Sequence, residues 1–577
     1  MTANGWLQLI VFVALLTAIV PVLGGYMARV FGGEPVLLAR VLGPVERGIY
    51  RLIATDPKAG QDWKAYARSV LVFSAASWLL LYLILRTQSI HPWNPEGFGA
   101  APWDVSFNTT SSFVTNTNWQ FYAGETTLSY FSQMAGLAVQ NFVSAAVGIA
   151  VAIAVIRGIV SRSGASLGNF WADLTRSVLY ILLPISIVVG IFLISQGVIQ
   201  SLGAYADLKT LTGASQTLAL GPVASQEVIK ELGTNGGGFF NVNSAMPFEN
   251  PSALTNYVEM LLILAIPAAL TATFGRMAGR RRQGWMLYGV MLVWLVAGIA
   301  IVYAAETHGS PAQHLAGIAG GNLEGKDVRF GEIGPSMFAA ITTVTSCGAV
   351  NAAMESLTGL GSAVPLANMG TGEVIFGGVG SGLYGMLLFV LLAVFLSGLM
   401  VGRTPEYLGK KIEAREIKLV AIGTLFMPVM VLTVTALSLA TKWGAPSMSA
   451  SGPQGFGETL YAYMSQGNNN GSAFAGFTGF VQPNAPGNSG SFGITFADLL
   501  GGLTMIGGRF IPLLAALAVA GALAGKRIAP PGPGTMRTDT PVFGALLLGA
   551  IALVALLTFV PALLLGPIVQ SLTDQLF

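Results

Sequence analysis

Charged residues and cysteine are scarce in this sequence of 577 residues. Asp, Glu, Lys and Arg make up only 10% of it, whereas a soluble domain usually carries about 25%. The single cysteine, Cys347, excludes an internal disulfide and a cysteine-rich metal site. The three histidines, His91, His308 and His314, fall in expected loops without the spacing of metal ligands. We therefore expect a surface that mostly faces lipid, and no resident metal ion or other cofactor.

Nucleotide-binding motifs are also missing. The Gly-Lys pairs that begin at Gly325, Gly409 and Gly525 are never followed by Ser or Thr, so the sequence has no P-loop. It has no Asp-Lys-Thr-Gly stretch that could carry a phosphorylated aspartate. The net charge is only +3, which gives no reason to expect a nucleic-acid partner. If ATP drives a process here, another chain must hydrolyse it.

Long apolar stretches dominate what is present. The sequence is 53% hydrophobic, and its mean hydropathy is +0.66. A stretch of about 20 apolar residues spans a bilayer, so we expect an all-α polytopic membrane protein with about ten transmembrane helices in the lipid bilayer. The first stretch lacks a preceding basic residue and a clear cleavage site, which favours a retained span over a signal peptide. The expected spans are 7–27, 69–86, 133–156, 178–200, 256–274, 285–304, 379–401, 417–441, 503–524 and 541–565.

Basic residues are distributed very unequally between the two sets of connecting loops. Of the 29 lysines and arginines, 22 fall in one alternate set and five in the other. Loops rich in Lys and Arg stay on the cytoplasmic side of a membrane. Because ten spans place both termini on one side, we expect both termini outside the cytoplasm.

Four loops of the other, outward set share a local pattern. They read SFVTNTNWQ (112–120), ELGTNGGGFF (231–240), TTVTSCGAV (342–350) and YMSQGNNNGSAF (463–474). We align Thr117 with the three glycines Gly236, Gly348 and Gly471. The predicted filter residues before this column are Thr115, Asn116, Thr234, Asn235, Ser346, Cys347, Asn469 and Asn470. Any one loop could be an ordinary Gly/Asn turn, but four at corresponding places indicate an internal repeat.

The pattern predicts a cation filter. Backbone carbonyl oxygens can replace the water shell of K⁺, and glycine adopts the backbone angles that such a chain needs. A half-helix before each loop would point its partially negative end at the ion. We expect four fused span–pore loop–span repeats over 69–156, 178–274, 285–401 and 417–524, with extra helices in 1–68 and 541–577.

Several residues outside the loops are candidates for supporting roles. Arg509 lies in an apolar stretch, where a charge is usually functional, although it could also reach the outer interface. The glycine-rich stretch GEVIFGGVGSGLYG (372–385) predicts a broken segment that gates or redirects the ion, and the residues predicted there are Glu373, Gly377 and Gly378. Glu373 and Glu355 could attract a cation or could be solvated. Gln120 could support the filter or simply lie at the interface.

The motifs resemble one family closely. The stretches GTNGGGFFNVNSAMPFENP, TSCGAVN, QGNNNGSAFAG and VGRTPEYLGKKIE are similar to those of KdpA, the potassium-binding subunit of bacterial Kdp potassium-transporting ATPases. The resemblance implies a non-catalytic chain of the bacterial plasma (inner) membrane that passes K⁺ through an intramembrane tunnel to a partner. The implied partners are a P-type ATPase subunit (KdpB-like), a single-span subunit (KdpC-like) and sometimes a short accessory peptide (KdpF-like). Arg403, one of the inward basic residues, is the predicted partner contact.

Two other classes of protein remain as alternatives. A stand-alone Trk- or Ktr-like K⁺ translocating subunit shares the four-loop plan, but the two extra spans favour the ATPase subunit. A membrane enzyme would need converging His, Asp or Glu at membrane depth, and we expect none in the spans.

Overall fold

The computed structural model describes residues 2–162, 164, 166–402, 404–474, 476–478, 491–530 and 535–572, with the side chains of 401 and 491–495 left out. Arg403 lies outside these described residues. Within that part of the chain ten helical segments are long and apolar enough to cross a membrane, and each overlaps a predicted span. The prediction of an all-α polytopic membrane protein is therefore confirmed. The boundaries of the four repeats remain a prediction.

The long helices of the described chain are α1 (Ala3–Gly32), α3 (Trp63–Arg86), α6 (Val139–Val160), α8 (Leu183–Ser195), α10 (Ala253–Met277), α11 (Arg281–His308), α15 (Ser381–Val401), α16 (Ala414–Ala440), α18 (Ser491–Ala524) and α19 (Pro541–Leu563). π-Helical turns over 132–138 and 177–182 extend α6 and join α7 (Phe170–Arg176) to α8. A further π-helical turn over 564–568 joins α19 to α20 (Val569–Leu572). The remaining helices are α2 (Ala39–Leu52), α4 (Trp103–Val114), α5 (Gly124–Thr127), α9 (Val223–Leu232), α12 (Pro311–Leu315), α13 (Ile333–Val344), α14 (Gly359–Gly370) and α17 (Gly452–Asn468).

Local sequence accounts for the start and the burial of the central helix α10. Its first turn has a reciprocal cap: the Ser252 hydroxyl accepts the Thr255 N–H, and the Thr255 hydroxyl accepts the Ser252 N–H. The most apolar stretches of α10 and α6 are 83% buried, whereas that of α3 is only 22% buried. Helices α6 and α10 thus form the centre of the molecule, and α3 exposes apolar side chains such as Leu79 and Leu80 where lipid would lie.

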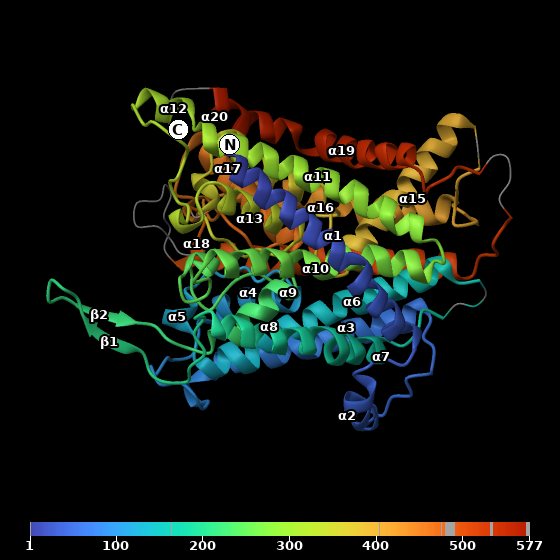
Figure 1. Ribbon diagram of the computed structural model, residues 1–577, viewed down its shortest axis with the longest axis horizontal. Coiled ribbons are helices and arrows are strands. Elements are labelled where there is room, and N and C mark those ends of the chain that lie inside the picture. The colour runs from blue at the N-terminus through green and yellow to red at the C-terminus, as the bar shows by residue number, and fades with distance from the viewer. Residues whose placement is uncertain are drawn as a thin grey trace.

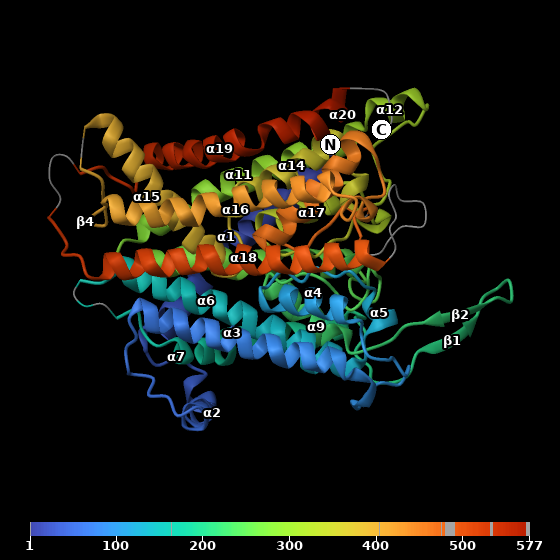
Figure 2. The same cartoon turned by 180° about the vertical axis from the view of Figure 1, so that it is seen from behind.

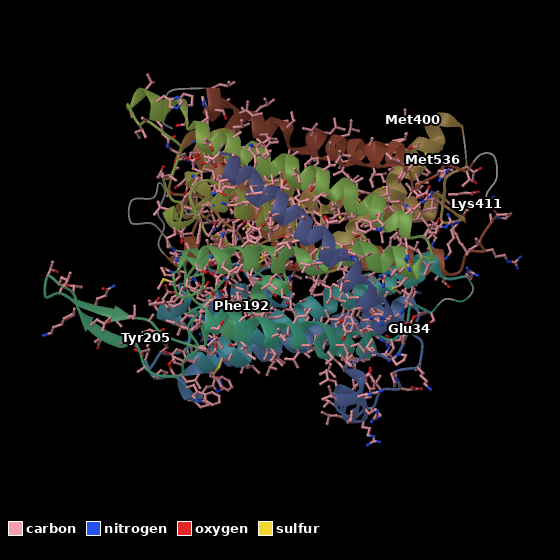
Figure 3. All side chains as sticks on the ribbon, viewed as in Figure 1. Glu34, Phe192, Tyr205, Met400, Lys411 and Met536 are labelled. Carbon is pink, nitrogen blue, oxygen red and sulfur yellow. The ribbon has the colours of Figure 1, made fainter. Side chains whose placement is uncertain are left out.

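The two ends of the molecule differ in what they carry. Figure 1 shows both ends of the described chain at the end that also carries the projecting hairpin of β1 (Ala206–Lys209) and β2 (Ser215–Leu218). Helix α2 and the short hairpin of β3 (Glu406–Tyr407) and β4 (Lys410–Lys411) lie at the opposite end (Figure 2). Lys411 and Glu34 mark this second end in Figure 3, and Tyr205 marks the first. The second end is therefore the one that collects the basic loops. The sequence pattern had not indicated either hairpin.

Four short helices, α4, α9, α13 and α17, are buried inside the ring of long helices. Each is too short to span a bilayer and ends in one of the four predicted loops. Irregular backbone at this depth is tolerated only when protein or a cavity surrounds it. The four helices therefore place the loops inside the molecule with their partially negative ends toward them.

The predicted broken segment is present. Helix α14 ends at Gly370 and α15 begins at Ser381, and the ten residues between them form no regular helix. Glu373 and Phe376 have positive φ values of 48° and 60°, which strain residues that carry side chains. The third repeat therefore enters its second span through an irregular segment.

Candidate cation filter

The four loops that follow the short helices share one backbone pattern. In each loop a residue with positive φ follows the helix: Asn116 (67°), Thr234 (47°), Ser346 (48°) and Asn469 (62°). The N–H of the next residue donates to the carbonyl five positions back, at 2.8–3.2 Å, in Thr117, Asn235, Cys347 and Asn470. The four loops thus adopt the same turn although the sequences on either side of them differ.

This pattern corrects the predicted register of the first loop. The position after the bonded N–H has positive φ in every loop and is occupied by Asn118 (55°), Gly236 (71°), Gly348 (87°) and Gly471 (105°). Asn118, and not Thr117, therefore corresponds to the three glycines. Asparagine tolerates the left-handed region better than most side chains do, so the loop needs no glycine there.

The glycines are required because neighbouring loops approach one another closely. A Cβ atom on Gly236 would lie 1.8 Å from the backbone oxygen of Cys347 in the third loop. A Cβ on Gly348 would lie 2.3 Å from the oxygen of Asn470, and one on Gly471 would lie 2.0 Å from the oxygen of Thr117. The loops thus contact in the order second, third, fourth, first, which closes a ring.

The ring presents free backbone oxygens. The carbonyl oxygens of Thr117, Asn235, Cys347 and Asn470 accept no hydrogen bond from any described residue, and all four residues are fully buried. Buried carbonyls are normally paired. Four unpaired oxygens in one ring are what a dehydrated cation would require.

Side-chain amides join the first loop to its neighbours. Asn116 donates to the Thr234 oxygen at 2.9 Å, and Asn118 donates to the Gly236 oxygen at 2.9 Å. Asn235 donates to the Asn116 side-chain oxygen at 2.6 Å. These bonds fix two loops against each other, so the filter positions do not depend on glycine alone.

Gln120 lies at the outer side of this ring. Its amide group donates to the Gly238 oxygen and accepts the Gly238 N–H, both at 3.1 Å, so it bonds the backbone of the second loop. An outer cavity of about 810 Å³ is lined by Gln120 and by residues of all four loops, among them Asn118, Gly237, Gly348 and Gly471. Glu355 follows Met354, which lines this cavity, and accepts the Gly476 N–H at 2.6 Å.

The irregular segment between α14 and α15 contacts the inner side of the ring. The Glu373 carboxylate accepts hydrogen bonds from the Ser346 hydroxyl and, at 2.7 Å, from the Asn470 amide. The Gly377 N–H donates to the Val344 oxygen at 2.9 Å, at the end of α13. A Cβ on Gly378 would lie 3.4 Å from the Ser346 side chain. The segment thus bonds the third and fourth loops directly.

Arg509 lies in the middle of α18, below the fourth loop. Its side chain is buried, and its guanidinium donates to the Ser144 oxygen of α6 at 3.4 Å. No carboxylate among the described residues lies within salt-bridge distance of it. Arg509, Glu373, Tyr384, Ser346 and Asn469 line an inner cavity of about 70 Å³. The guanidinium therefore faces the protein interior and does not extend to the outer interface.

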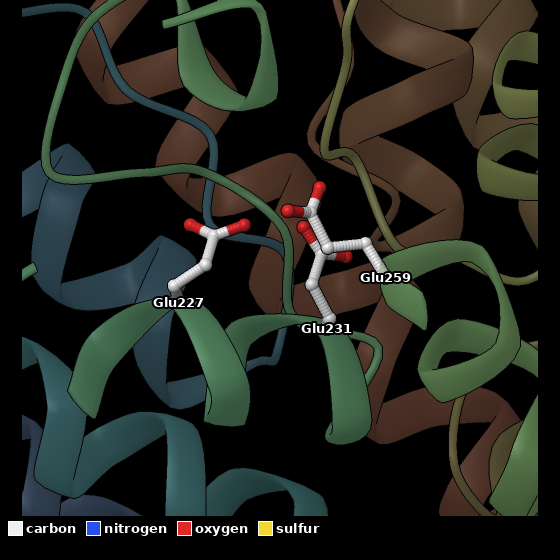
Figure 4. A group of neighbouring side chains, drawn as sticks. All are labelled: Glu227, Glu231 and Glu259. Carbon is white, nitrogen blue, oxygen red and sulfur yellow. The ribbon is translucent and has the colours of Figure 1, made fainter. Parts of the chain in front are cut away.

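One cluster was missed by the sequence analysis. Glu227, Lys230 and Glu231 of α9 meet Glu249 and Glu259 in a fully buried group behind the second loop (Figure 4). The expectation that no acidic side chains converge in the spans was wrong, because Glu259 belongs to α10. The spacing of Glu227 and Glu231, four residues apart on one helix face, was the only signal in the sequence.

Fold and site together define a polytopic membrane protein with a ring of four re-entrant pore loops, an arrangement that suits the selection of a cation. The chain belongs to the KdpA family: residues 10–572 match the family described as potassium-transporting ATPase A subunit. A relative from Brucella anthropi is 53% identical over 572 residues and covers 99% of both chains. Relatives from Rhizobium rhizogenes and Methylobacterium nodulans are 52% and 53% identical over 99% of this chain, and over 99% and 98% of their own. All three are named potassium-transporting ATPase potassium-binding subunit.

Proposed function

We propose that this chain is the K⁺-binding and K⁺-selecting subunit of an ATP-driven, high-affinity K⁺ uptake system. It is a non-catalytic chain, and the ATPase activity belongs to a partner. Membership of the KdpA family supports this function over that of a stand-alone Trk- or Ktr-like subunit. K⁺ is the transported ligand, and we propose no other cofactor.

The ring of unpaired backbone oxygens is the observation that carries the proposal. The described oxygens belong to four different loops, and each loop follows the C-terminal end of a buried helix. A cation in the ring would gain the oxygens and the helix ends together. An anion would be repelled by both. We therefore assign the predicted filter residues to K⁺ binding, with Asn118 added to them.

The two cavities support a route for the ion. The outer cavity touches all four loops, and the smaller inner cavity begins at Ser346 and Asn469. The inner cavity is also lined by Leu388 of α15 and Thr424 of α16, so it extends sideways between helices. We propose that K⁺ leaves the filter by this side and passes through an intramembrane tunnel to a P-type ATPase subunit.

The membrane and its sidedness are part of the same proposal. The chain is a multi-pass membrane protein, and we place it in the bacterial plasma (inner) membrane. The basic loops favour a cytoplasmic position for the end that carries α2, which leaves both termini and the filter loops outside. A single-span subunit, and in some complexes a short accessory peptide, would complete the assembly.

Co-purification tests the subunit assignment. Cells grown at low K⁺ would supply membranes, and an affinity tag on this chain would recover its partners. We expect a P-type ATPase chain to accompany it, with K⁺-stimulated ATP hydrolysis in the complex. The chain purified alone should hydrolyse no ATP. K⁺-stimulated hydrolysis by the isolated chain would contradict the assignment.

A further inference from the structure

Four glutamates and one lysine meet behind the second filter loop. Glu227, Lys230 and Glu231 come from α9, Glu249 from the loop that follows the filter, and Glu259 from α10. All five side chains are buried. None of them contributes an oxygen to the ring, although the Lys230 ammonium donates to the Gly237 oxygen of the second loop at 3.0 Å.

Lys230 is the single cation that the described residues bring to this cluster. Its ammonium lies 2.9 Å from carboxylate oxygens of Glu227 and Glu249 and 3.4 Å from Glu231. One ammonium compensates one carboxylate, so four ionised glutamates would leave three negative charges unbalanced. An unpaired charge is costly in a buried site, and a buried acid avoids that cost by keeping its proton.

Glu259 is the member without a partner. Both of its carboxyl oxygens are buried, and neither has a hydrogen-bond partner within 3.5 Å among the described residues. The Ser244 hydroxyl faces Glu259 as well, but it lies closer to Glu227 and Glu231, at 3.2 and 3.3 Å. One oxygen each of Glu227, Glu231 and Glu259 lie within 4.8 Å of one another. Figure 4 shows the Glu231 and Glu259 carboxyl groups together, with Glu227 across from them. Ionised carboxylates only accept hydrogen bonds, whereas a protonated acid can donate one. A proton on Glu259 would therefore supply the missing bond.

The surroundings of Glu259 favour this arrangement. The titratable or charged groups that face it are Glu227, Lys230 and Glu231 on α9 and Glu249 on the loop before α10. Lys230 is already engaged with three other carboxylates of the cluster. A proton on Glu259 removes one of the three unbalanced negative charges and gives Glu259 a hydrogen bond, whereas a metal ion would place a second cation beside Lys230.

We propose that Glu259 is a neutral carboxylic acid whose proton is donated to the adjacent carboxylate of Glu231, and that it is thereby a positioning residue for the filter. The proton stays on Glu259, and no bond is broken. Glu231 in turn accepts the thiol hydrogen of Cys347, with 3.4 Å between sulfur and oxygen. Cys347 is a member of the ring in the third loop, and Glu231 lies three residues before Thr234 of the second. Glu259 thus fixes a side chain that ties two filter loops together.

Matched substitutions in the whole complex test this role. Glu259→Ala removes the proposed donor from Glu259 to Glu231, which keeps its contacts with Cys347, Ser244 and Lys230, so the K⁺ concentration for half-maximal uptake should rise about tenfold. Glu259→Gln keeps an N–H donor of nearly the same shape and should bring that concentration back to within about twofold of the wild type. Glu249→Gln is the control. Glu249 accepts hydrogen bonds from the Lys230 ammonium and the Phe240 N–H, so the same chemical change there removes an acceptor and should weaken uptake. At alkaline pH the wild type should lose affinity while Glu259→Gln does not.

Infrared spectroscopy gives a second, independent measurement. The purified complex should show the carbonyl band of a buried, protonated carboxylic acid, and Glu259→Gln should lack it. The affinity measurements rest on the proposed K⁺-binding function, whereas the infrared band does not, so the two failures can be told apart. The band also decides the matter if Glu259→Ala does not assemble.

Three results would overturn the proposal. The first is a Glu259→Gln variant that assembles normally but is as weak as Glu259→Ala. The second is an infrared band that is unchanged in Glu259→Gln. The third is a calcium or magnesium ion that remains bound to the purified complex and is lost in Glu259→Gln, which would show that a metal ion and not a proton balances the carboxylates.

Discussion

Alanine at Gly236 is the most direct perturbation of the filter ring. The added Cβ would lie 1.8 Å from the Cys347 oxygen and 2.6 Å from the Ala349 nitrogen. Carbon and oxygen atoms approach to about 3.3 Å, so one loop must move by about 1.5 Å. Because Gly236 has a φ of 71°, alanine adds backbone strain of about 1–2 kcal/mol as well. No flexible side chain lies between the two loops to absorb the movement.

The movement should appear as weaker K⁺ binding. It displaces the Cys347 oxygen, which is one of the four unpaired oxygens of the ring. A hydrogen bond to a charged group contributes about 1.5–3 kcal/mol, and an ion–carbonyl contact is of the same order. Losing one such contact should raise the K⁺ concentration for half-maximal uptake by about 10- to 150-fold. The maximal rate should change less, because the route beyond the filter is intact.

The assay is K⁺ uptake by cells that lack other K⁺ uptake systems, with the amount of the chain in the membrane measured in parallel. Gly279→Ala is the matched control: Gly279 has a φ of 64°, and a Cβ there would meet no atom within 4 Å. It should cost about 1–2 kcal/mol of stability and leave the affinity unchanged. A Gly236→Ala variant with wild-type affinity would refute the ring, and so would an equal loss of affinity in both variants.

Three further outcomes can be measured. Glu373→Gln replaces one acceptor oxygen by an amide donor that faces the Ser346 hydroxyl or the Asn470 amide. The affinity for K⁺ in uptake should therefore fall about tenfold. An unchanged K⁺ concentration for half-maximal uptake would show that Glu373 does not support the filter. Arg509→Gln removes the positive charge beside the inner cavity. Rubidium tracer should therefore leak through the complex in vesicles that contain no ATP. A complex that is unstable but does not leak would show that Arg509 has a role in folding only. Burial lowers the pKa of Lys410 from 10.5 to about 8, so between these pH values the unfolded chain binds more protons than the folded one, and stability rises with pH. The Tm of the wild type minus the Tm of Lys410→Met should therefore increase from pH 8 to about pH 10. A value that stays constant over this range would contradict the prediction.

The spans and the approximate places of the loops were predictable because they depend on local features of the sequence. An apolar run is long enough to cross a bilayer or it is not, and clusters of Gly, Asn and Thr interrupt such runs at four places. The register of the first loop was not predictable from glycine alone. Asn118 adopts the positive φ that glycine adopts in the other three loops, and its amide bonds the Gly236 oxygen in addition. Because Asn118 both adopts the positive φ and makes this hydrogen bond, an alignment on glycine residues alone does not identify it.

The glutamate cluster escaped prediction for a different reason. Glu227 and Glu231 share a helix face, which the sequence shows, but Glu249 and Glu259 reach them through a turn and the start of another span. Each span considered by itself contains too few acids to suggest a site. Convergence of this kind is a property of the packing between α9 and α10, so only the structure reveals it.

The ring is also unequal in what supports it. The first two loops are joined to each other by the amides of Asn116 and Asn118. The third and fourth loops are joined by the Asn470 amide, which donates to the Thr342 oxygen at 2.9 Å, and also through Glu373, which accepts from both and belongs to the irregular segment before α15. The same segment also contacts the second loop, because the Val379 N–H donates to the Thr234 hydroxyl at 2.8 Å. The third and fourth loops, which reach the inner cavity through Ser346 and Asn469, are therefore held by a carboxylate of the segment, whereas the second loop is held through a backbone N–H.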